Sequence, residues 1–280
     1  MAKFLIGLVL GVGIAYLAYR ARALNQRGAV AAAILGTVVF GLGGLGWAIV
    51  TLTFFISASG LSRLFTSRKH DVGQDFAKGS RRDAGQVAAN GAIGGTAALA
   101  YFLVDRYAPG SSLLTLMWLA FAASFAGANA DTWATELGVL NPQLPVLLTS
   151  FKRVPQGTSG AVSLVGTLAA LLGAALVAGA AVLVVQVGWV SGIGLPSWVQ
   201  FIVITVGGLL GAFIDSLLGA SAQAVYYCPA CQMETERYPF HGCGTQTSRR
   251  RGLLWLNNDW VNAACTFSAG MVGILLGIIF

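Results

Sequence analysis

The chain has 280 residues, of which 56% are hydrophobic and 10% charged, and its formal net charge is +7. Soluble domains carry about 25% charged residues, so this composition excludes an ordinary soluble globular protein. The positive charge suits a surface facing anionic lipids and nucleotide phosphates, whereas nucleic acid is not an expected partner, because no basic patch is interleaved with exposed aromatic residues.

Uncharged segments long enough to cross a bilayer, about 20 helical residues, recur along the chain. Two of them, residues 28–62 and 154–214, are too long for one crossing, and turn signals at residues 41–46 and 192–196 divide each into two. The sequence therefore predicts an all-α integral membrane protein, a polytopic helical bundle forming a single domain over residues 1–280. The eight expected spans are residues 4–19, 28–42, 45–61, 84–104, 113–130, 160–187, 198–220 and 260–280.

The basic residues predict the orientation of this bundle. With eight spans, 15 of the 17 Lys and Arg residues fall in loops on one side, leaving Lys3 and Arg106 on the other. The positive-inside rule makes the first side cytoplasmic, so both termini lie outside. Nine of the ten acids fall on the same cytoplasmic side, although acids contribute little to orientation, and this indicates a functional face there.

The first polar residues with a candidate role precede the span at residues 84–104. If a helix starts just before Asp83, then Asp83, Gln86 and Asn90 share one face over two turns. A polar stripe entering a membrane must face the protein interior or a wet cavity, so Asp83 and Asn90 are candidate substrate-binding residues. The alternative is hydrogen bonding between helices for packing.

The end of the span at residues 113–130 carries the most informative acids. An ionised carboxylate costs about 2.5–3.5 kcal/mol at the centre of an inserted helix and less near its ends, so Asp131 is a candidate metal ligand. Glu136 follows about 140° around a continuous helix. The two share a metal most easily if the helix unwinds near residues 127–129 or if the ion bridges helices. For Glu136 the alternative is a charge at the helix end that reaches water.

A second acid, Asp215, has a matching position in the span at residues 198–220. GAFIDS at residues 211–216 repeats the pattern of GANADT at residues 127–132, although six residues do not prove duplication. Many membrane folds place the substrate site between internal repeats, so two matched acids favour a site assembled between two helices. Mg²⁺ suits such a site, because it needs few protein oxygen ligands and takes the rest from waters and substrate phosphates.

Between these acids, residues 152–160 read KRVPQGTSG and lead into an apolar span. Lys152 and Arg153 precede a Gly-rich turn, and Thr158 or Ser159 is the expected N-cap of the next helix. Backbone N–H groups at a helix start favour anions, and Arg binds phosphate through paired hydrogen bonds, so this segment is a candidate phosphate cradle. The Walker A pattern is absent, and the alternative is an ordinary capped helix with orienting charges.

A cytoplasmic loop is expected at residues 221–258, and it contains Cys228, Cys231, His241 and Cys243. Cys-x-x-Cys is a common zinc-ligand spacing, and three thiolates with one imidazole complete a tetrahedral site. The reducing cytosol disfavours a disulfide, so a structural Zn²⁺ is the preferred interpretation, with unliganded thiols as the alternative.

The loop leads into WLNNDWVN at residues 255–262. This segment brings Asn258 and Asp259 to the interface that carries the other acids, so Asp259 is a further candidate Mg²⁺ ligand and Asn258 a candidate nucleotide-binding residue. Cys265, inside the last span, is expected to be an inert buried thiol.

Six segments together resemble one known family. RRDAGQVAANG, GANADTWATELG, RVPQGTSGAVSLVG, GAFIDSLLGASAQ, the Cys/His loop and WLNNDWVN occur in this order between residues 81 and 262. They look like the membrane family of plant and cyanobacterial phytyl-phosphate kinases of tocopherol biosynthesis, which is related to polyprenol kinases and CTP-dependent phosphatidate cytidylyltransferases. The chain departs from the family pattern at Ser150 and Phe151, where Thr-Gly is expected before Lys152.

The resemblance implies transfer of a phosphoryl group from a nucleoside triphosphate, CTP, to a membrane prenyl monophosphate such as phytyl phosphate. Phosphoryl transfer needs positioning and charge neutralisation more than covalent chemistry from the protein. The expected roles are Mg²⁺ coordination for Asp131 and Asp215 with Glu136 or Asp259, phosphate or nucleotide binding for Asp83, Asn90, Lys152, Arg153, Thr158, Ser159 and Asn258, and acceptor binding for Arg82.

Other functions fit parts of the same pattern. A CTP-dependent lipid cytidylyltransferase, which releases pyrophosphate, or a prenol kinase would use the same metal and phosphate site. A lipid transporter or scramblase is favoured by the possible repeat and by the 37 glycines. Against the transporter, the polar residues cluster on one face, whereas transporters usually bind near the bilayer midplane. The sequence leaves the oligomeric state open.

Overall fold

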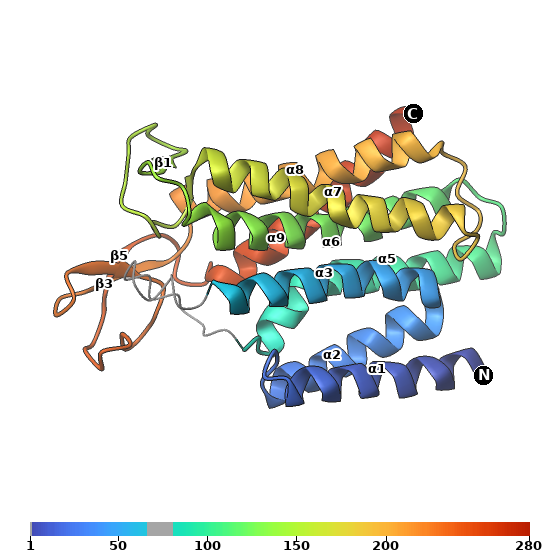
Figure 1. Ribbon diagram of the computed structural model, residues 1–280, viewed down its shortest axis with the longest axis horizontal. Helices are drawn as coiled ribbons and strands as arrows, with labels where there is room; N and C mark the ends of the chain where they lie inside the picture. The colour runs from blue at the N-terminus through green and yellow to red at the C-terminus, as the bar shows by residue number, and fades with distance from the viewer. Residues whose placement is uncertain (1, 66–80) are drawn as a thin grey trace.

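The computed structural model describes residues 2–65 and 81–280, which form a bundle of long helices with two small sheets at one end (Figure 1). Three basic residues that predict the orientation, Arg68, Lys69 and Lys78, lie outside the described residues. Helices are the expected form of apolar segments, because a backbone in lipid must satisfy its own hydrogen bonds. The helices are α1 (Ala2–Arg20), α2 (Gln26–Val38), α3 (Leu45–Leu64), α5 (Ala84–Tyr107), α6 (Leu113–Gly138), α7 (Leu164–Gln186), α8 (Ser197–Ser221) and α9 (Asn258–Ile279).

The predicted helical membrane bundle is confirmed. Within the described ranges, seven helices are long and apolar enough to cross a membrane, and α1 adds a shorter apolar stretch, Phe4–Arg20. Both predicted divisions are present. A π-helical segment, Val39–Gly43, extends α2 and ends at Gly44, whose φ of +82° is readily adopted by glycine and turns the chain into α3. Residues 187–196 separate α7 from α8.

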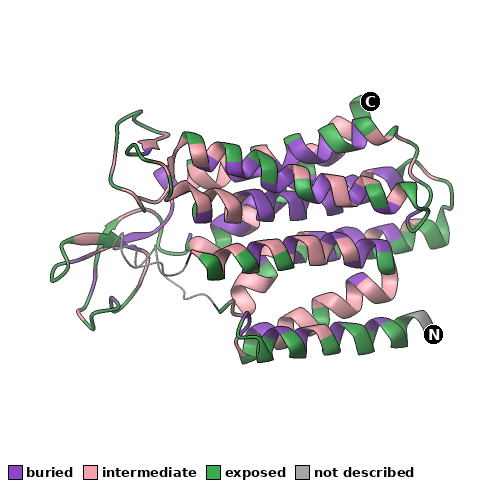
Figure 2. Ribbon diagram, viewed as in Figure 1, coloured by how far each residue is buried: buried purple, intermediate pink, exposed green. Residues whose placement is uncertain are grey.

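Helix α6 is the centre of the bundle. It packs against α3, α5, α7, α8 and α9, and its first 18 residues are largely buried (Figure 2). Trp118 and Phe121 of α6 pack against Trp47 of α3 through edge-on and tilted ring contacts. Phe125 packs edge-on against Phe121. Gly and Ala at the other contacts let the helix backbones approach closely, which is how membrane helices gain packing energy.

Helices α1 and α2 form a hairpin at the edge of the bundle. The hairpin loop is joined to the segment before α5 by two backbone hydrogen bonds: Asn25 N–H donates to the Arg82 carbonyl at 3.0 Å, and Arg82 N–H donates to the Ala23 carbonyl at 2.9 Å. Gly28, in the first turn of α2, packs directly against the same Arg82 carbonyl, where a larger residue would clash. The hairpin therefore fixes the backbone of Arg82 from both sides.

The two sheets lie at the end of the bundle opposite both termini (Figure 1). In the first, β1 (Val146–Leu147) pairs antiparallel with β2 (Ala161–Val162) between α6 and α7. The second has the order β4-β3-β5 and occupies the segment between α8 and α9, which was predicted only as a loop. Its antiparallel strands are β3 (Val225–Cys228), β4 (Met233–Thr235) and β5 (Ser248–Arg251).

Candidate functional site

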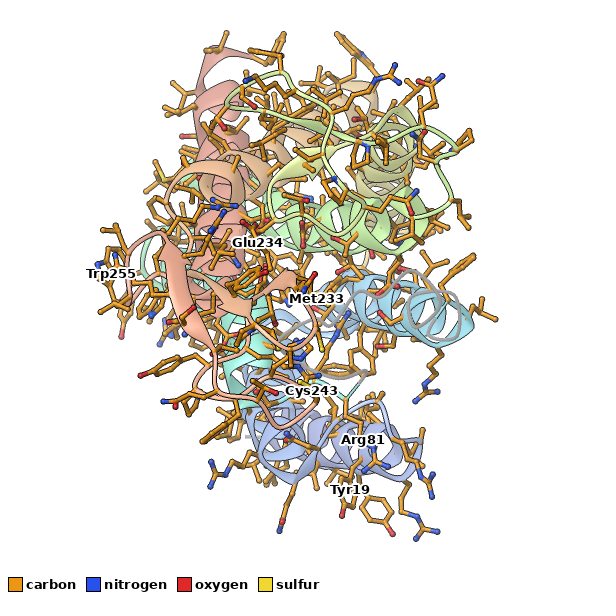
Figure 3. All side chains as sticks on the ribbon, turned by 90° about the vertical axis from the view of Figure 1, so that its left-hand side faces the viewer. Tyr19, Arg81, Met233, Glu234, Cys243 and Trp255 are labelled. Atoms are coloured by element: carbon orange, nitrogen blue, oxygen red, sulfur yellow. The ribbon has the colours of Figure 1, made fainter. Side chains whose placement is uncertain are left out.

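A polar cavity of about 820 Å³ opens at the sheet end of the bundle. Its walls come from the ends of α5, α6, α7, α8 and α9, from residues 156–163, and from the segment after β4. We call it the polar cavity. Figure 3 views the molecule from this end, where Met233 and Glu234 of β4 and Cys243 of the following loop face the viewer.

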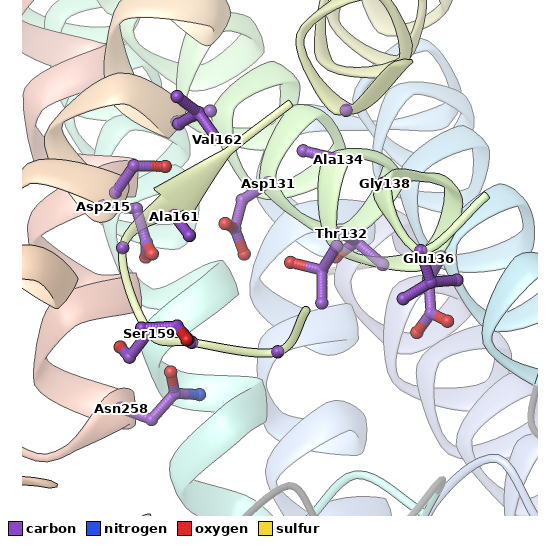
Figure 4. A pocket seen from close by; sticks show the side chains of 18 of the residues that line it. Asp131, Thr132, Ala134, Glu136, Gly138, Ser159, Ala161, Val162, Asp215 and Asn258 are labelled. Carbon is purple, nitrogen blue, oxygen red and sulfur yellow. The ribbon is translucent and has the colours of Figure 1, made fainter. Parts of the chain in front are cut away.

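Asp131 and Asp215, the two acids of the repeated hexapeptide, both line the polar cavity, one from α6 and the other from α8 (Figure 4). The glycine that precedes each acid by four residues explains their convergence. A Cβ added at Gly127 would lie 2.8 Å from the Cβ of Ala269 on α9, and one added at Gly211 would lie 2.8 Å from the same atom. The two glycines therefore bring α6 and α8 against one turn of α9, and each Asp follows one helical turn later on the same side.

Helix α6 is continuous through residues 127–129, so the unwinding that would unite Asp131 with Glu136 does not occur. Asp131 instead meets an acid on a neighbouring helix. One carboxylate oxygen of Asp215, Oδ2, is buried without a hydrogen-bond partner in the part of the chain that the structure describes. A buried carboxylate oxygen in this state requires a cation or a proton. With Asp131 in electrostatic range, Asp215 fits the hard-oxygen donor set of Mg²⁺.

A third carboxylate, Glu236 after β4, lines the cavity within electrostatic range of Asp131 and Asp215. The Gln223 amide donates to Glu236 Oε1 at 2.7 Å, and the Ser159 hydroxyl donates to the Gln223 carbonyl oxygen at 2.8 Å. Burial raises the pKa of Glu236, although the hydrogen bond from Gln223 opposes the shift. The sequence did not single out Glu236, because Glu234, two residues earlier, has the same local composition and is exposed.

The other predicted acids lie apart from this group. Glu136 lines the polar cavity farther along α6 than Asp131 (Figure 4), and its Oε1 accepts a hydrogen bond from the Ser62 hydroxyl of α3 at 2.7 Å. Asp259 lies in the first turn of α9, within electrostatic range of Glu236, but it is not among the cavity-lining residues. Asp83 is the N-cap of α5 and forms a capping box with Gln86.

Arg82, for which the sequence predicts binding of the acceptor phosphate, lines the polar cavity. Its guanidinium lies over the ring of Phe54 at 5.0 Å and near that of Phe55 at 5.8 Å, both on α3. Burial lowers the pKa of Arg82 to about 10, and the negative charge of Glu136 opposes this shift. Arg82 therefore keeps its charge at neutral pH and is held in one orientation by the rings and by its fixed backbone.

Only the second half of the predicted phosphate cradle lines the polar cavity. Thr158 and Ser159 line the polar cavity, whereas Lys152 and Arg153 are exposed on the β1–β2 connection and do not line it. Gly160, at φ +79°, packs against the last turn of α8, which fixes the loop next to Asp215. Arg237, one residue after Glu236, is a basic residue that the sequence analysis did not single out. It lines the polar cavity together with Arg82.

The predicted N-cap of the next helix was wrong. Helix α7 begins at Leu164, and its N-cap is Ser163, whose hydroxyl accepts a hydrogen bond from Gly166 N–H at 3.1 Å. Residues 161–162 are paired in β2, and this keeps Thr158 and Ser159 outside the helix. Both hydroxyls bond elsewhere: Thr158 donates to the Pro155 carbonyl at 2.8 Å, and Ser159 donates to Gln223.

A second, narrow cavity of about 80 Å³ adjoins the polar one. It lies between the α1–α2 hairpin and helices α3 and α5, and its lining is almost entirely apolar, so we call it the apolar cavity. Arg82, Gln86 and Asn90 line both cavities. The predicted polar stripe of α5 therefore marks the boundary between them, and Asn258, on α9, lines the polar cavity only.

The four predicted zinc ligands lie together. The Sγ atoms of Cys228, Cys231 and Cys243 and one ring nitrogen of His241 are all within 4.8 Å of one another. His241 also lines the polar cavity. Cys265 is buried in α9, as expected for an inert thiol.

Sequence comparisons connect the chain with proteins of plants, cyanobacteria and archaea. The sequence model of the family described as "Integral membrane protein DUF92" matches residues 9–270. Protein PGR of Arabidopsis thaliana is 29% identical over 235 residues, which cover 81% of each chain. An uncharacterized membrane protein of Methanocaldococcus jannaschii is 27% identical over 282 residues, covering 99% of this chain and 95% of that one.

A chloroplastic relative extends the same comparison. Protein VTE6, chloroplastic, of Arabidopsis thaliana is 27% identical over 253 residues, which cover 90% of this chain and 65% of that protein. No solved structure matches the chain. The matched region contains every residue placed so far in the polar cavity, so the family likeness extends to the site as well as to the spans.

Proposed function

The chain belongs to the integral membrane family DUF92, and from this premise we propose that it is a phosphotransferase acting on a membrane prenyl monophosphate. It transfers the γ-phosphoryl group of a nucleoside triphosphate, CTP, to a lipid such as phytyl phosphate and so forms the diphosphate. The proposed activity rests on the resemblance of six segments to phytyl-phosphate kinases. The likeness of the chain to VTE6 and PGR supports a role in a related branch of metabolism.

The observation that carries the proposal is the contact between two unlike cavities. The polar cavity is lined by four acids and two arginines, whereas the apolar cavity beside it is bounded by membrane helices. A substrate with a phosphate head and an isoprenoid tail matches this division. Arg82, at the boundary, is positioned to bind the phosphate of a lipid whose first isoprene units enter the apolar cavity and whose remaining chain extends into the bilayer.

The reaction requires little covalent chemistry from the protein. An oxygen of the acceptor phosphate attacks the γ-phosphorus, the bond from that phosphorus to the β,γ-bridging oxygen breaks, and a nucleoside diphosphate leaves. A phosphate monoester is largely ionised near neutral pH, so no strong general base is needed. Arg82 and Arg237 would orient the reacting phosphates, and Ser159 and Gln223 would hold Glu236 in place.

Mg²⁺ is the proposed cofactor, held by Asp131, Asp215 and Glu236. When bound, it would neutralise part of the triphosphate charge. The buried Oδ2 of Asp215 supports this assignment, because the described residues offer it no hydrogen bond. Among the acids predicted from the sequence, Glu136 and Asp259 are the less suitable ligands, since one points toward α3 and the other does not line the cavity.

The decisive experiment follows the label of the nucleotide into the lipid. Purified protein is reconstituted into liposomes with phytyl phosphate and Mg²⁺, and CTP labelled at the α- or the γ-phosphate is added. A kinase moves only the γ label into lipid, as the diphosphate. Transfer of the α label, with release of pyrophosphate, would instead identify a cytidylyltransferase.

Two parallel reactions test the remaining alternatives. Phytol in place of phytyl phosphate separates a prenol kinase from a prenyl-phosphate kinase, because only the former phosphorylates the free alcohol. ATP, GTP and UTP in place of CTP test the nucleotide. Movement of a labelled lipid across the bilayer without nucleotide, together with no phosphoryl transfer from any nucleotide, would overturn the proposal in favour of a transporter or scramblase.

A further inference from the structure

The cluster of Cys228, Cys231, His241 and Cys243 is the strongest feature that the phosphotransferase proposal does not use. The two sulfur atoms of Cys228 and Cys243 are 3.6 Å apart, and His241 Nδ1 is 3.5 Å from Cys231 Sγ and 3.2 Å from Cys243 Sγ. Ligand sulfurs of a tetrahedral zinc are separated by ~3.8 Å when each Zn–S bond is ~2.3 Å. All four cysteines of the chain are free thiols.

Two tight turns bring these ligands together. Cys228 ends β3, and Cys231 lies in the turn that leads to β4, in which Gln232 has a φ of +53°. In the second turn, Gly244 N–H donates to the His241 carbonyl at 2.9 Å, and His241 N–H donates to the Thr245 carbonyl at 2.9 Å. Each turn therefore presents one pair of ligands, which is the arrangement of small structural zinc sites.

We propose that this cluster is a structural Zn²⁺ site and that the ion holds the wall of the polar cavity that carries Glu236 and Arg237. Three thiolates and an imidazole select zinc over magnesium, because soft sulfur ligands prefer zinc and four ligands leave no open position for chemistry. The site is separate from the carboxylates proposed to bind Mg²⁺, which offer only oxygen.

The chain between the two turns explains how the zinc site acts on the cavity. Residues 232–240 connect Cys231 to His241, and they include Glu236 and Arg237, which line the cavity. Part of this stretch is strand β4, which pairs with β3 in the sheet. After β4, the Thr247 hydroxyl bonds to the Arg237 carbonyl at 3.0 Å, and the ring of Tyr238 stacks on that of Tyr226 in β3. With both ends of the stretch fixed to one ion, Glu236 keeps a defined position opposite Asp131 and Asp215. The ion is a positioning device and takes no part in phosphoryl transfer.

The first test is the metal content of the protein itself. Full-length protein, purified in detergent without chelator, is expected to contain about one zinc per chain by elemental analysis, since the four ligands complete one tetrahedral site. Exchange of the metal for Co²⁺ should produce the thiolate-to-cobalt absorption of a sulfur-rich tetrahedral site. Neither readout depends on substrate, so both stand even if the proposed phosphotransferase activity fails.

Matched variants locate the ion. Cys231→Ser should lose most of the zinc and make residues 228–243 more sensitive to protease, whereas Cys265→Ala, which removes the buried thiol of α9, should keep the full zinc content. Zinc-free wild-type protein with an intact protease-resistant loop would overturn the proposal, and so would full zinc retention in Cys231→Ser. Iron in place of zinc would overturn the identity of the metal.

A third measurement tests the link to Glu236. If the ion positions this carboxylate, Cys231→Ser should weaken Mg²⁺ binding to the detergent-solubilised protein, and Glu236→Gln should weaken it to a similar extent without loss of zinc. Unchanged Mg²⁺ affinity in a zinc-free Cys231→Ser protein would refute the positioning role.

Discussion

At the scale of single residues, three of the four carboxylates that line the polar cavity are brought toward one another by three different elements. Asp131 comes from α6, Asp215 from α8 and Glu236 from the segment after β4. Three like charges inside a membrane protein are costly when no cation is present. The arrangement is therefore best understood as a binding site, and its energetic cost is offset when a divalent ion is bound.

The first residue-scale prediction concerns Asp131 and Asp215. Asp131→Asn and Asp215→Asn should each lower the rate of phosphoryl transfer in liposomes by about 100-fold or more, because loss of a metal ligand removes several kcal/mol of charge stabilisation. Asp105→Asn is the matched control, since Asp105 is exposed at the other end of α5. Near-normal rates in both cavity variants would show that these acids do not hold the metal.

The second residue-scale prediction concerns pH. Because burial raises the pKa of Glu236 above 4.5, this carboxylate becomes protonated at a higher pH than an ordinary Glu. The Mg²⁺ concentration needed for half-maximal activity should therefore rise as the pH falls below neutral, and Glu236→Gln should weaken this dependence. Lower pH weakens Mg²⁺ binding, but it should stabilise the folded protein when no metal is bound. Glu236 takes up a proton more readily in the folded than in the unfolded state, so the free energy of unfolding rises as the pH falls toward 4.5. A Mg²⁺ requirement with the same pH dependence in both proteins would contradict the assignment.

At the scale of elements, helix α9 acts as the common partner of α6 and α8. Gly127 and Gly211 both face Ala269, so the repeated hexapeptide is a packing motif and a chemical motif at once. The glycine brings two helices together, and the acid one turn later faces the cavity. This dual role accounts for the recurrence of the pattern without requiring a duplicated ancestor.

The prediction from this packing is that Ala269→Gly restores the stability of one glycine variant and not of the other. Gly127→Ala and Gly211→Ala should each destabilise the protein by roughly 1–3 kcal/mol, as overpacking does. Ala269→Gly should restore the first variant, because the Ala269 Cβ is the one close obstacle there. It should not restore the second, because a Cβ at position 211 would also lie 2.7 Å from the Cys265 carbonyl oxygen. Thermal unfolding in detergent measures both, and equal rescue would contradict this account of the packing.

A further prediction at this scale concerns the α1–α2 hairpin. Gly28→Ala should displace the Arg82 carbonyl and with it the guanidinium, and so raise the KM for the lipid acceptor roughly tenfold, the loss expected for one charge-assisted hydrogen bond. The KM for the nucleotide should change less. Gly60→Ala, a helical glycine with open space around it, serves as the control. An unchanged KM for the acceptor in Gly28→Ala would argue against Arg82 as the acceptor ligand.

At the scale of the whole molecule, the bundle has two chemically different ends. The polar cavity and the three-stranded sheet lie at one end, and both termini lie at the other (Figure 1). Long apolar side chains are exposed on the outer faces of α1, α8 and α9, as expected for surfaces that contact lipid. The proposed substrates fit this polarity, because a nucleotide arrives from water and a prenyl phosphate from the bilayer.

The whole-molecule prediction concerns orientation, for which the distribution of Lys and Arg predicts a cytoplasmic polar cavity. Ser112→Cys, between α5 and α6, should react with a membrane-impermeant thiol reagent added to intact cells, whereas Ser150→Cys, at the sheet end, should react only after permeabilisation. Both positions are exposed. The unsubstituted protein provides the background, and the reverse labelling pattern would place the polar cavity outside the cell.

The sequence predicted the helices and two of the three converging acids because those features depend on composition and local pattern. Asp131 and Asp215 stand out as charges in apolar segments, and Arg82 stands out at a helix start. Glu236 could not be distinguished from Glu234, because the difference between them is which one the β3–β4 hairpin turns toward the cavity. Arg153 is predicted from the sequence because it lies next to a Gly-rich turn along the chain. Arg237 is not, because the course of its loop across the cavity is a tertiary property.

The boundary at Arg82, where the polar and apolar cavities meet, has a consequence for kinetics. A substrate held by this boundary is delivered by diffusion within the plane of the membrane, while the nucleotide is delivered from bulk water. On the proposed function, the rate would follow the mole fraction of prenyl phosphate in the bilayer and not its total concentration in the sample. Adding inert phospholipid at constant acceptor would then slow the reaction by surface dilution, and adding more vesicles of the same composition would leave the turnover per enzyme unchanged.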